Sequence, residues 1–278
     1  MNKTVTVQVN AKINLSLYVV GKTERYHMLN SVVASVDIAD VISARTAEKD
    51  EMIFSDKTID CEKSNAYAAL KYMRSKYSLP CVSVSVRNEI PCGAGLGGSS
   101  ADCAGVILAV NKLFSLDLTL NEMREAANNF GSDTAYMLTG GFAVLQGRGE
   151  VIERFESAFS PSVFIAYKGS VGTKECFSLF DRRNDGESAK NSEKLVSALQ
   201  IGDESAVTEL LENDLTSCAA ALNEGITRIF ELAGRRKCVM TGSGAGVVIF
   251  GGDEELAKNL EKEGITVIKT RVLPSSRR

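Results

Sequence analysis

The sequence has few of the residues on which metal sites and nucleic-acid surfaces depend. Its 278 residues include one histidine, and none of the seven cysteines forms a C-x-x-C pair, which argues against a zinc site. The formal net charge is −3 and there is no long basic block, so nucleic acid is not an expected partner. An odd cysteine count without an export signal predicts reduced thiols, most of them buried.

Long apolar runs are also absent. No run approaches the roughly 20 residues of a membrane-spanning helix, so no membrane partner is expected. Residues 1–10 lack the apolar core and cleavage site of a signal peptide. With 44% hydrophobic and 24% charged residues, the composition is typical of a soluble globular protein. We expect a cytoplasmic monomer or homodimer that acts on a small molecule.

Hydrophobic periodicity predicts a mixture of strands and helices. Apolar and polar residues alternate from Val5 to Val19, which indicates a half-buried strand or a pair of strands, with Lys12 and Asn14 on the polar face. Further strands are expected at 31–43, 82–86, 142–145, 163–167, 238–240, 247–250 and 266–272. Helices are expected at 65–77, 101–114, 120–130, within 191–233, and at 253–263, with a loop at 184–186 and a disordered tail at 274–278. The pattern changes near residue 160, which suggests two domains, 1–155 and 156–278.

Residues 91–101 read Pro-Cys-Gly-Ala-Gly-Leu-Gly-Gly-Ser-Ser-Ala and directly precede a predicted helix. Glycines let the backbone approach a ligand closely, and unpaired N–H groups at a helix start bind phosphate. The stretch lacks the Gly-Lys-Ser/Thr ending of a Walker A loop, and no βαβ unit supports its superficial match to the dinucleotide fingerprint. A flexible loop without a ligand is the alternative, although ordering so many glycines is then costly.

This stretch resembles the ATP-binding motif of the GHMP kinases. Further segments, in the family's order, are similar to one branch, the 4-diphosphocytidyl-2-C-methyl-D-erythritol kinases; these are Ala11–Leu15, Tyr26-His27, Gly131–Asp133, Gly140-Gly141, Gly147–Glu150 and Met240–Gly244. The resemblance implies an α+β fold of two domains, an N-terminal mixed sheet with helices and a smaller C-terminal antiparallel sheet with helices, with the active site in the cleft between them. It also implies ATP-dependent phosphorylation of the 2-hydroxyl of 4-diphosphocytidyl-2-C-methyl-D-erythritol, on the methylerythritol phosphate route to isoprenoid precursors. Mg²⁺ would arrive with ATP.

The resemblance implies roles for individual residues near the phosphates. The implied ATP-binding residues are Asn65, Pro91, Gly93, Ala94, Gly95, Leu96, Gly97, Gly98, Ser99 and Ser100. Asp133 would take the proton of the acceptor hydroxyl, although an aspartate before Thr-Ala-Tyr-Met is also a good helix N-cap, and both roles can hold. Lys12 would be the activating cation, whereas the residue pattern alone describes an ordinary solvent-facing lysine on a sheet.

The resemblance also implies a site for the substrate. Asn14 would contact the substrate, Tyr26 would stack on the cytosine, and His27 would bond the edge of this base. Thr173 and Phe177 fall where the family has a threonine and an aromatic residue. Phe177 would cover the other face of the base, although a core phenylalanine on an amphipathic helix explains it equally well.

Some positions depart from the family pattern. Ser99 replaces a glycine and Ala101 a serine, so the serine that contacts phosphate is Ser99 or Ser100. Asn88 stands where a lysine is common, and Arg25 where a glycine usually precedes Tyr-His. Two alternatives therefore stay open, a GHMP kinase for mevalonate, homoserine or a sugar, and a non-catalytic GHMP-fold protein that binds a nucleotide. The Tyr26-His27 pair argues against the first alternative, and Lys12 with Asp133 argues against the second.

Overall fold

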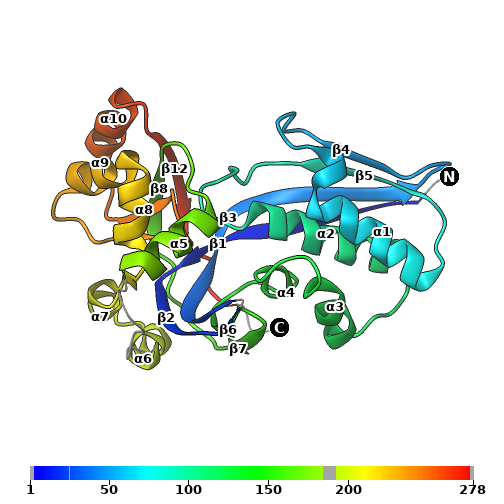
Figure 1. Ribbon diagram of the computed structural model, residues 1–278, viewed down its shortest axis with the longest axis horizontal. Helices are drawn as coiled ribbons and strands as arrows, with labels where there is room; N and C mark the ends of the chain where they lie inside the picture. Colours follow the sequence, from blue (N-terminus) through cyan, green and yellow to red (C-terminus); the bar gives the residue numbers. More distant parts are fainter. Residues whose placement is uncertain (1–2, 25, 184–191, 276–278) are drawn as a thin grey trace. The chain divides into compact units, whose positions relative to one another are not determined.

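The computed structural model describes residues 3–24, 26–183 and 192–275 (Figure 1). The chain packs as two compact units. Unit 1 comprises Met1–Ala11, Ile38–Pro91 and Gly97–Gly140, and unit 2 comprises Lys12–Asp37, Cys92–Leu96 and Gly141–Arg278. The first and third strands, β1 (Thr4–Asn14) and β3 (His27–Thr46), contribute residues to both units. The division into 1–155 and 156–278 stays a prediction.

Unit 1 combines strands with helices. Its other elements are β4 (Glu51–Phe54), the 3-10 turn η1 (Cys61–Lys63), α1 (Asn65–Tyr77), β5 (Val82–Arg87), α2 (Gly98–Phe114), α3 (Leu120–Ala127) and α4 (Thr134–Met137). Strand β5 pairs antiparallel with the end of β3 and parallel with β4. Helices α1 and α2 pack side by side. Gly105 allows α2 to approach β3, because a Cβ there would lie only 2.4 Å from Cδ1 of Ile42.

Unit 2 contains the four-stranded antiparallel sheet β10-β11-β8-β12. The strands of this unit are β2 (Ser16–Lys22), β6 (Ala143–Gly147), β7 (Val151–Arg154), β8 (Ser162–Tyr167), β9 (Glu212–Asn213), β10 (Cys238–Met240), β11 (Val247–Phe250) and β12 (Thr266–Arg271). Its helices are α5 (Thr173–Arg183), α6 (Glu193–Ile201), α7 (Glu204–Glu209), α8 (Thr216–Leu222), α9 (Glu224–Ala233) and α10 (Glu254–Lys262).

Helices α8, α9 and α10 gather beside this four-stranded sheet (Figure 1). Helix α9 buries Ile226, Ile229 and Ala233, whose spacing of three and four residues puts them on one face. They join Val247 and Ile249 of β11 in a hydrophobic core. This core fixes the positions of the β10–β11 turn and of α5, which carry candidate site residues.

Most of the predicted elements are confirmed, with informative differences at their ends. Helix α1 has the predicted bounds, and Thr119 caps α3 in a reciprocal capping box with Glu122. Helix α2 starts at Gly98, three residues earlier than expected, since glycines and serines provide its first turn. The short strand β9 interrupts the predicted helical region 191–233. The sequence did not indicate β4, β7 or η1, all of which are four residues or shorter, whereas α4 begins directly after Asp133, where an N-cap was considered.

Three smaller expectations can be compared with the structure. The expected loop at 184–186 lies outside the described residues, as does most of the expected tail, although the Ser275 amide donates to the Ser157 carbonyl. All seven cysteines are free thiols, but only Cys103, Cys176 and Cys218 are fully buried, fewer than expected. No helix among the described residues has the length and apolarity to cross a membrane.

Candidate functional site

The glycine loop before α2 is shaped by left-handed backbone conformations. Gly93, Gly95 and Gly97 have φ angles of 73°, 72° and 79°, which side-chain-bearing residues rarely adopt. Gly97 is the N-cap residue of α2 and makes no side-chain cap, so the first N–H groups of a 17-residue helix are available to an anion. Ala94 and Leu96 are buried and anchor the loop, while Ser99 is exposed and Ser100 is half-buried.

Within unit 1, the turn that carries Asp133 lies beside this helix start. A Cβ on Gly131 would lie 3.4 Å from Oγ of Ser100 and 3.1 Å from Oγ1 of Thr134. Asp133 is the N-cap residue of α4, as the alternative interpretation predicted, but its side chain makes no capping hydrogen bond. The carboxylate is therefore not used as a cap. Asn65 is exposed at the first position of α1.

Within unit 2, the first half of the loop is pinned from two sides. The Lys12 amide donates to the Leu96 carbonyl over 3.1 Å, and the Ala245 amide donates to the Gly93 carbonyl over 3.1 Å. Thr241 Oγ1 lies 3.1 Å from the Gly95 carbonyl oxygen. A Cβ at Gly95 would fall 2.2 Å from the Thr241 carbonyl oxygen, so only glycine fits there. The closing glycine turn at 241–246 thus supports the glycine loop.

The polar face of the first strand is exposed at Thr6 and Gln8 but becomes buried toward the end of the strand. Lys12 and Asn14 are each 4% exposed, so the expectation of an ordinary surface lysine is wrong. Lys12 Nζ donates to Asn14 Oδ1 over 2.6 Å, and Asn14 Nδ2 donates to Ser31 Oγ over 2.8 Å. The Gly242 amide also donates to Asn14 Oδ1. Asn14 is thus held by Ser31 and Gly242, and its amide oxygen fixes the position of the buried ammonium group.

Two of the predicted substrate residues, His27 of β3 and Phe177 of α5, are in contact with each other. His27 is the first residue of β3, and its ring stacks on Phe177 at 4.5 Å with 23° between the planes. Tyr26 is half exposed, with the Arg148 guanidinium 4.8 Å from its ring centre. Thr173 Oγ1 lies 2.9 Å from Ser243 Oγ of the closing turn. We call Tyr26, His27 and Phe177 the base platform.

Asp181 is a functional candidate that sequence reasoning missed. It accepts hydrogen bonds from Lys22 over 2.6 Å and lies 2.8 Å from Nε2 of His27. These hydrogen bonds, first from Lys22 and then from His27, lower the pKa of the Asp181 carboxyl. The only signal in the sequence is its spacing, because Phe177 and Asp181 share one face of a helix at i and i+4.

Unit 1 contains a buried pair of carboxyls, Asp40 and Asp102. Asp40 Oδ1 accepts the amides of Glu89 and Ile90, over 2.6 and 2.9 Å. Burial, and then the nearby Asp40 charge, raise the pKa of Asp102 to about 8. Asp40 Oδ2 is buried without a donor among the described residues, and a proton on Asp102 would supply one. Asn88, which departs from the family pattern described above, directs its amide nitrogen at Asp102.

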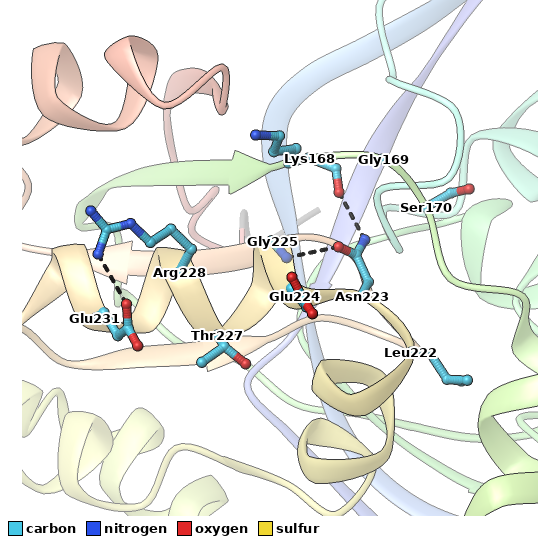
Figure 2. Close-up of a pocket in the computed structure, with 10 residues that line it drawn as sticks. All are labelled: Lys168, Gly169, Ser170, Leu222, Asn223, Glu224, Gly225, Thr227, Arg228 and Glu231. Carbon is cyan, nitrogen blue, oxygen red and sulfur yellow. Dashed lines mark hydrogen bonds and ion pairs between the residues drawn. The ribbon is translucent and has the colours of Figure 1, made fainter.

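A separate cavity of about 840 Å³ lies in unit 2 (Figure 2). Asn223 shapes its wall by donating to the Lys168 carbonyl and accepting from the Gly225 amide. The charged side chains that line the cavity have both signs, and among them Arg228 forms an ion pair with Glu231. None of the predicted site residues lines it. Among the described residues, no cluster of three or more His, Cys, Asp or Glu side chains could hold a metal ion.

Comparison with known proteins places these features in a family. A model of the GHMP kinases N terminal domain matches residues 64–144. The chain is 32% identical, over 266 residues, to the 4-diphosphocytidyl-2-C-methyl-D-erythritol kinase of Thermoanaerobacter pseudethanolicus, which covers 93% of this chain and 92% of the relative. The chain belongs to the GHMP kinase family. The kinase of the same name from Caldanaerobacter subterraneus subsp. tengcongensis is 34% identical over 262 residues, 91% of this chain and 90% of the relative.

Solved structures confirm the GHMP kinase fold. A 4-(cytidine 5'-diphospho)-2C-methyl-D-erythritol kinase superposes with a TM-score of 0.76 at 23% identity, covering 97% of this chain and all of the other. Homoserine kinase from Cytophaga hutchinsonii superposes with a TM-score of 0.74 at 16% identity, covering 99% of this chain and 96% of the other. Since kinases of different names share the architecture at these identities, the fold by itself does not select a substrate.

Proposed function

We propose that this GHMP kinase transfers the γ-phosphoryl group of ATP to the 2-hydroxyl of 4-diphosphocytidyl-2-C-methyl-D-erythritol. The observation that carries the proposal is the likeness, at 32–34% identity over about nine-tenths of the chain, to kinases named for this substrate. The base platform supports it, because the imidazole of His27 stacked on Phe177 offers an aromatic surface together with hydrogen-bonding atoms, which suit a substrate that carries a nucleobase. Mevalonate and homoserine have no base for such a platform to hold.

Each part of the site has a role in this reaction. The N–H groups at the start of α2, with Ser99 or Ser100, hold the phosphates of ATP, which arrives with Mg²⁺ as part of the substrate. Pro91, Gly93, Gly95, Gly97 and Gly98 let the backbone come close to these phosphates. Ala94 and Leu96 are buried, so they contribute through their backbone only.

The proton and the charge of the transfer are handled by side chains. Asp133 accepts the proton of the acceptor hydroxyl as it attacks, which is compatible with a carboxylate not engaged as a helix cap. Lys12, held by Asn14, offsets the negative charge on the transferred group. Asn14 has one amide hydrogen beyond its bond to Ser31, through which it would contact substrate. Thr173, Tyr26, His27 and Phe177 bind the cytidyl part.

A coupled assay of ADP release tests the proposal directly. The purified chain should release ADP from MgATP only when the cytidyl substrate is present, and not with mevalonate or homoserine. Free cytidine diphosphate should inhibit by competing for the base platform. Turnover of mevalonate or homoserine in place of the cytidyl substrate would refute the proposal, and nucleotide binding without any turnover would point to a non-catalytic protein.

A further inference from the structure

Asp181 joins two donors on the base platform. Lys22 ends β2 and His27 begins β3, and the β2–β3 pairing sets the two residues opposite each other. Asp181 Oδ1 lies 2.8 Å from Nε2 of His27, and Oδ2 lies 2.6 Å from Nζ of Lys22. Each carboxylate oxygen therefore has its own partner. Among the described residues, none is hydrogen-bonded to Nδ1 of His27.

The charge of Asp181 determines which ring nitrogen carries the proton. Hydrogen bonds from Lys22 and His27 lower the pKa of this carboxyl, so it is ionised at neutral pH and can only accept. A neutral imidazole facing such a carboxylate keeps its proton on the facing nitrogen, Nε2. The opposite nitrogen, Nδ1, then presents a lone pair.

The orientation of the imidazole ring is fixed by the same helix. Phe177 stacks on the His27 ring at 4.5 Å, and Phe180 meets it edge-on at 6.4 Å with 89° between the planes. The His27 side chain is only 14% exposed. Because Phe177 and Phe180 contact the ring independently of Asp181, we expect the ring to stay in place when the side chain at position 181 is changed.

We propose that Asp181 is a positioning residue for base selection: it holds the His27 proton on Nε2, so that Nδ1 accepts a hydrogen bond from the exocyclic amine of cytosine. This inference rests on the proposed function. A uracil ring in the same place would present a carbonyl oxygen, and two acceptors would face each other without a proton. Uridine diphosphate should therefore bind more weakly than cytidine diphosphate.

The substitution Asp181→Asn tests this, because Lys22 dictates how the amide turns. A lysine ammonium group can only donate, so it takes the amide oxygen and leaves the NH₂ group facing Nε2 of His27. Nε2 must then accept, and the proton moves to Nδ1. The preference for cytidine over uridine diphosphate, measured as the ratio of dissociation constants, should fall about tenfold or more.

Two further variants distinguish a change of the His27 tautomer from a general disturbance of the site as the cause of a lost cytidine preference. Lys22→Met alone leaves the carboxylate facing Nε2 and should keep the cytidine preference. In Lys22→Met/Asp181→Asn the amide is free to turn its oxygen toward Nε2, and most of the preference should return. A double variant as unselective as Asp181→Asn would contradict the proposal.

The tautomer can also be read without any ligand, since His27 is the only histidine in the chain. Nitrogen-15 NMR at about pH 9, well above the usual pKa of a free imidazole, should show the proton on Nε2 in the wild type and on Nδ1 in Asp181→Asn. A wild-type proton on Nδ1, or an unchanged cytidine preference in Asp181→Asn, overturns the role of Asp181. If neither diphosphate binds the wild type, the proposed function fails and base selection with it, whatever the tautomer.

Discussion

The glycine loop and the base platform are built by opposite means. The loop offers backbone N–H groups at the start of α2, and burial raises the pKa of two carboxyls of unit 1, Asp40 and Asp102. The platform offers side chains, and the carboxyl behind it, Asp181, is kept ionised by Lys22 and His27. Burial thus favours the protonated form of Asp102, whereas hydrogen bonds favour the ionised form of Asp181.

This difference separates the expected consequences of mutation. Changes at the proposed reacting end should lower turnover where they affect charge that develops during transfer. They should abolish binding of ATP where they disturb the backbone proposed to hold its phosphates. Changes at the base platform should raise KM and spare turnover, because they affect only the binding of a remote part of the substrate. The predictions below test this separation, in decreasing order of expected effect.

The largest effect is expected for Asp133→Asn. The amide keeps the shape of the side chain but cannot take the proton of the acceptor hydroxyl, so kcat should fall about a thousandfold or more with little change in KM. Steady-state kinetics with the cytidyl substrate measure both constants. Asp203→Asn, at the N-cap of α7, is the matched control and should leave kcat unchanged. A kcat within tenfold of the wild type would make Asp133 a structural residue.

The second prediction concerns the loop backbone. Gly97→Val should abolish ATP binding in calorimetry, because a β-branched side chain at φ 79° distorts the helix start that would hold phosphate. The strain also lowers the melting temperature. Gly202→Val is the matched control, since Gly202 has φ 75° at the end of α6 with nothing within 4 Å of an added Cβ. It should lose similar stability while binding ATP normally, and equal ATP affinity in both variants would remove the loop from the site.

The sequence predicted those parts of the candidate site whose residues are adjacent in the chain, and missed those that depend on distant partners. The glycine loop was readable because eleven consecutive residues carry its chemistry. The burial of Lys12 was not, because it depends on hydrogen bonds between Asn14 and Thr241, which are 227 positions apart. The role of Asp181 also depends on a partner 154 positions away, so its spacing from Phe177 meant little until β3 and α5 were placed together.

The third prediction concerns the base platform. Phe177→Ala should raise KM for the cytidyl substrate about tenfold to a hundredfold, since base stacking contributes roughly 1–3 kcal/mol, while kcat falls less. Tyr26→Ala should behave in the same way. Ile201→Ala, which truncates an exposed side chain at the end of α6, is the control for loss of apolar surface. A fall in kcat with unchanged KM would contradict the division between the two regions.

The smallest effect concerns pH, and it contrasts the two sets of carboxyls. The pKa of Asp102 is raised from 3.8 to about 8, so between these values the folded chain binds a proton that the unfolded chain has released. Its contribution to stability is therefore complete below about pH 4 and is lost as pH rises through 8. Asp181 has a lowered pKa, so its contribution is present at neutral pH and is lost as pH falls through the folded-state value.

Asp102→Asn, which mimics the protonated carboxyl, should therefore gain in melting temperature relative to the wild type as pH rises from about 5 to about 8, by a few degrees for a chain of this size. The melting temperature of Asp181→Asn should instead fall relative to that of the wild type as pH rises from about 3 to about 6, because the wild type gains its ionised carboxylate in this range. Differential scanning calorimetry of the three proteins across this range measures both trends. Parallel pH profiles for the two variants would show that Asp102 and Asp181 are not held in opposite states.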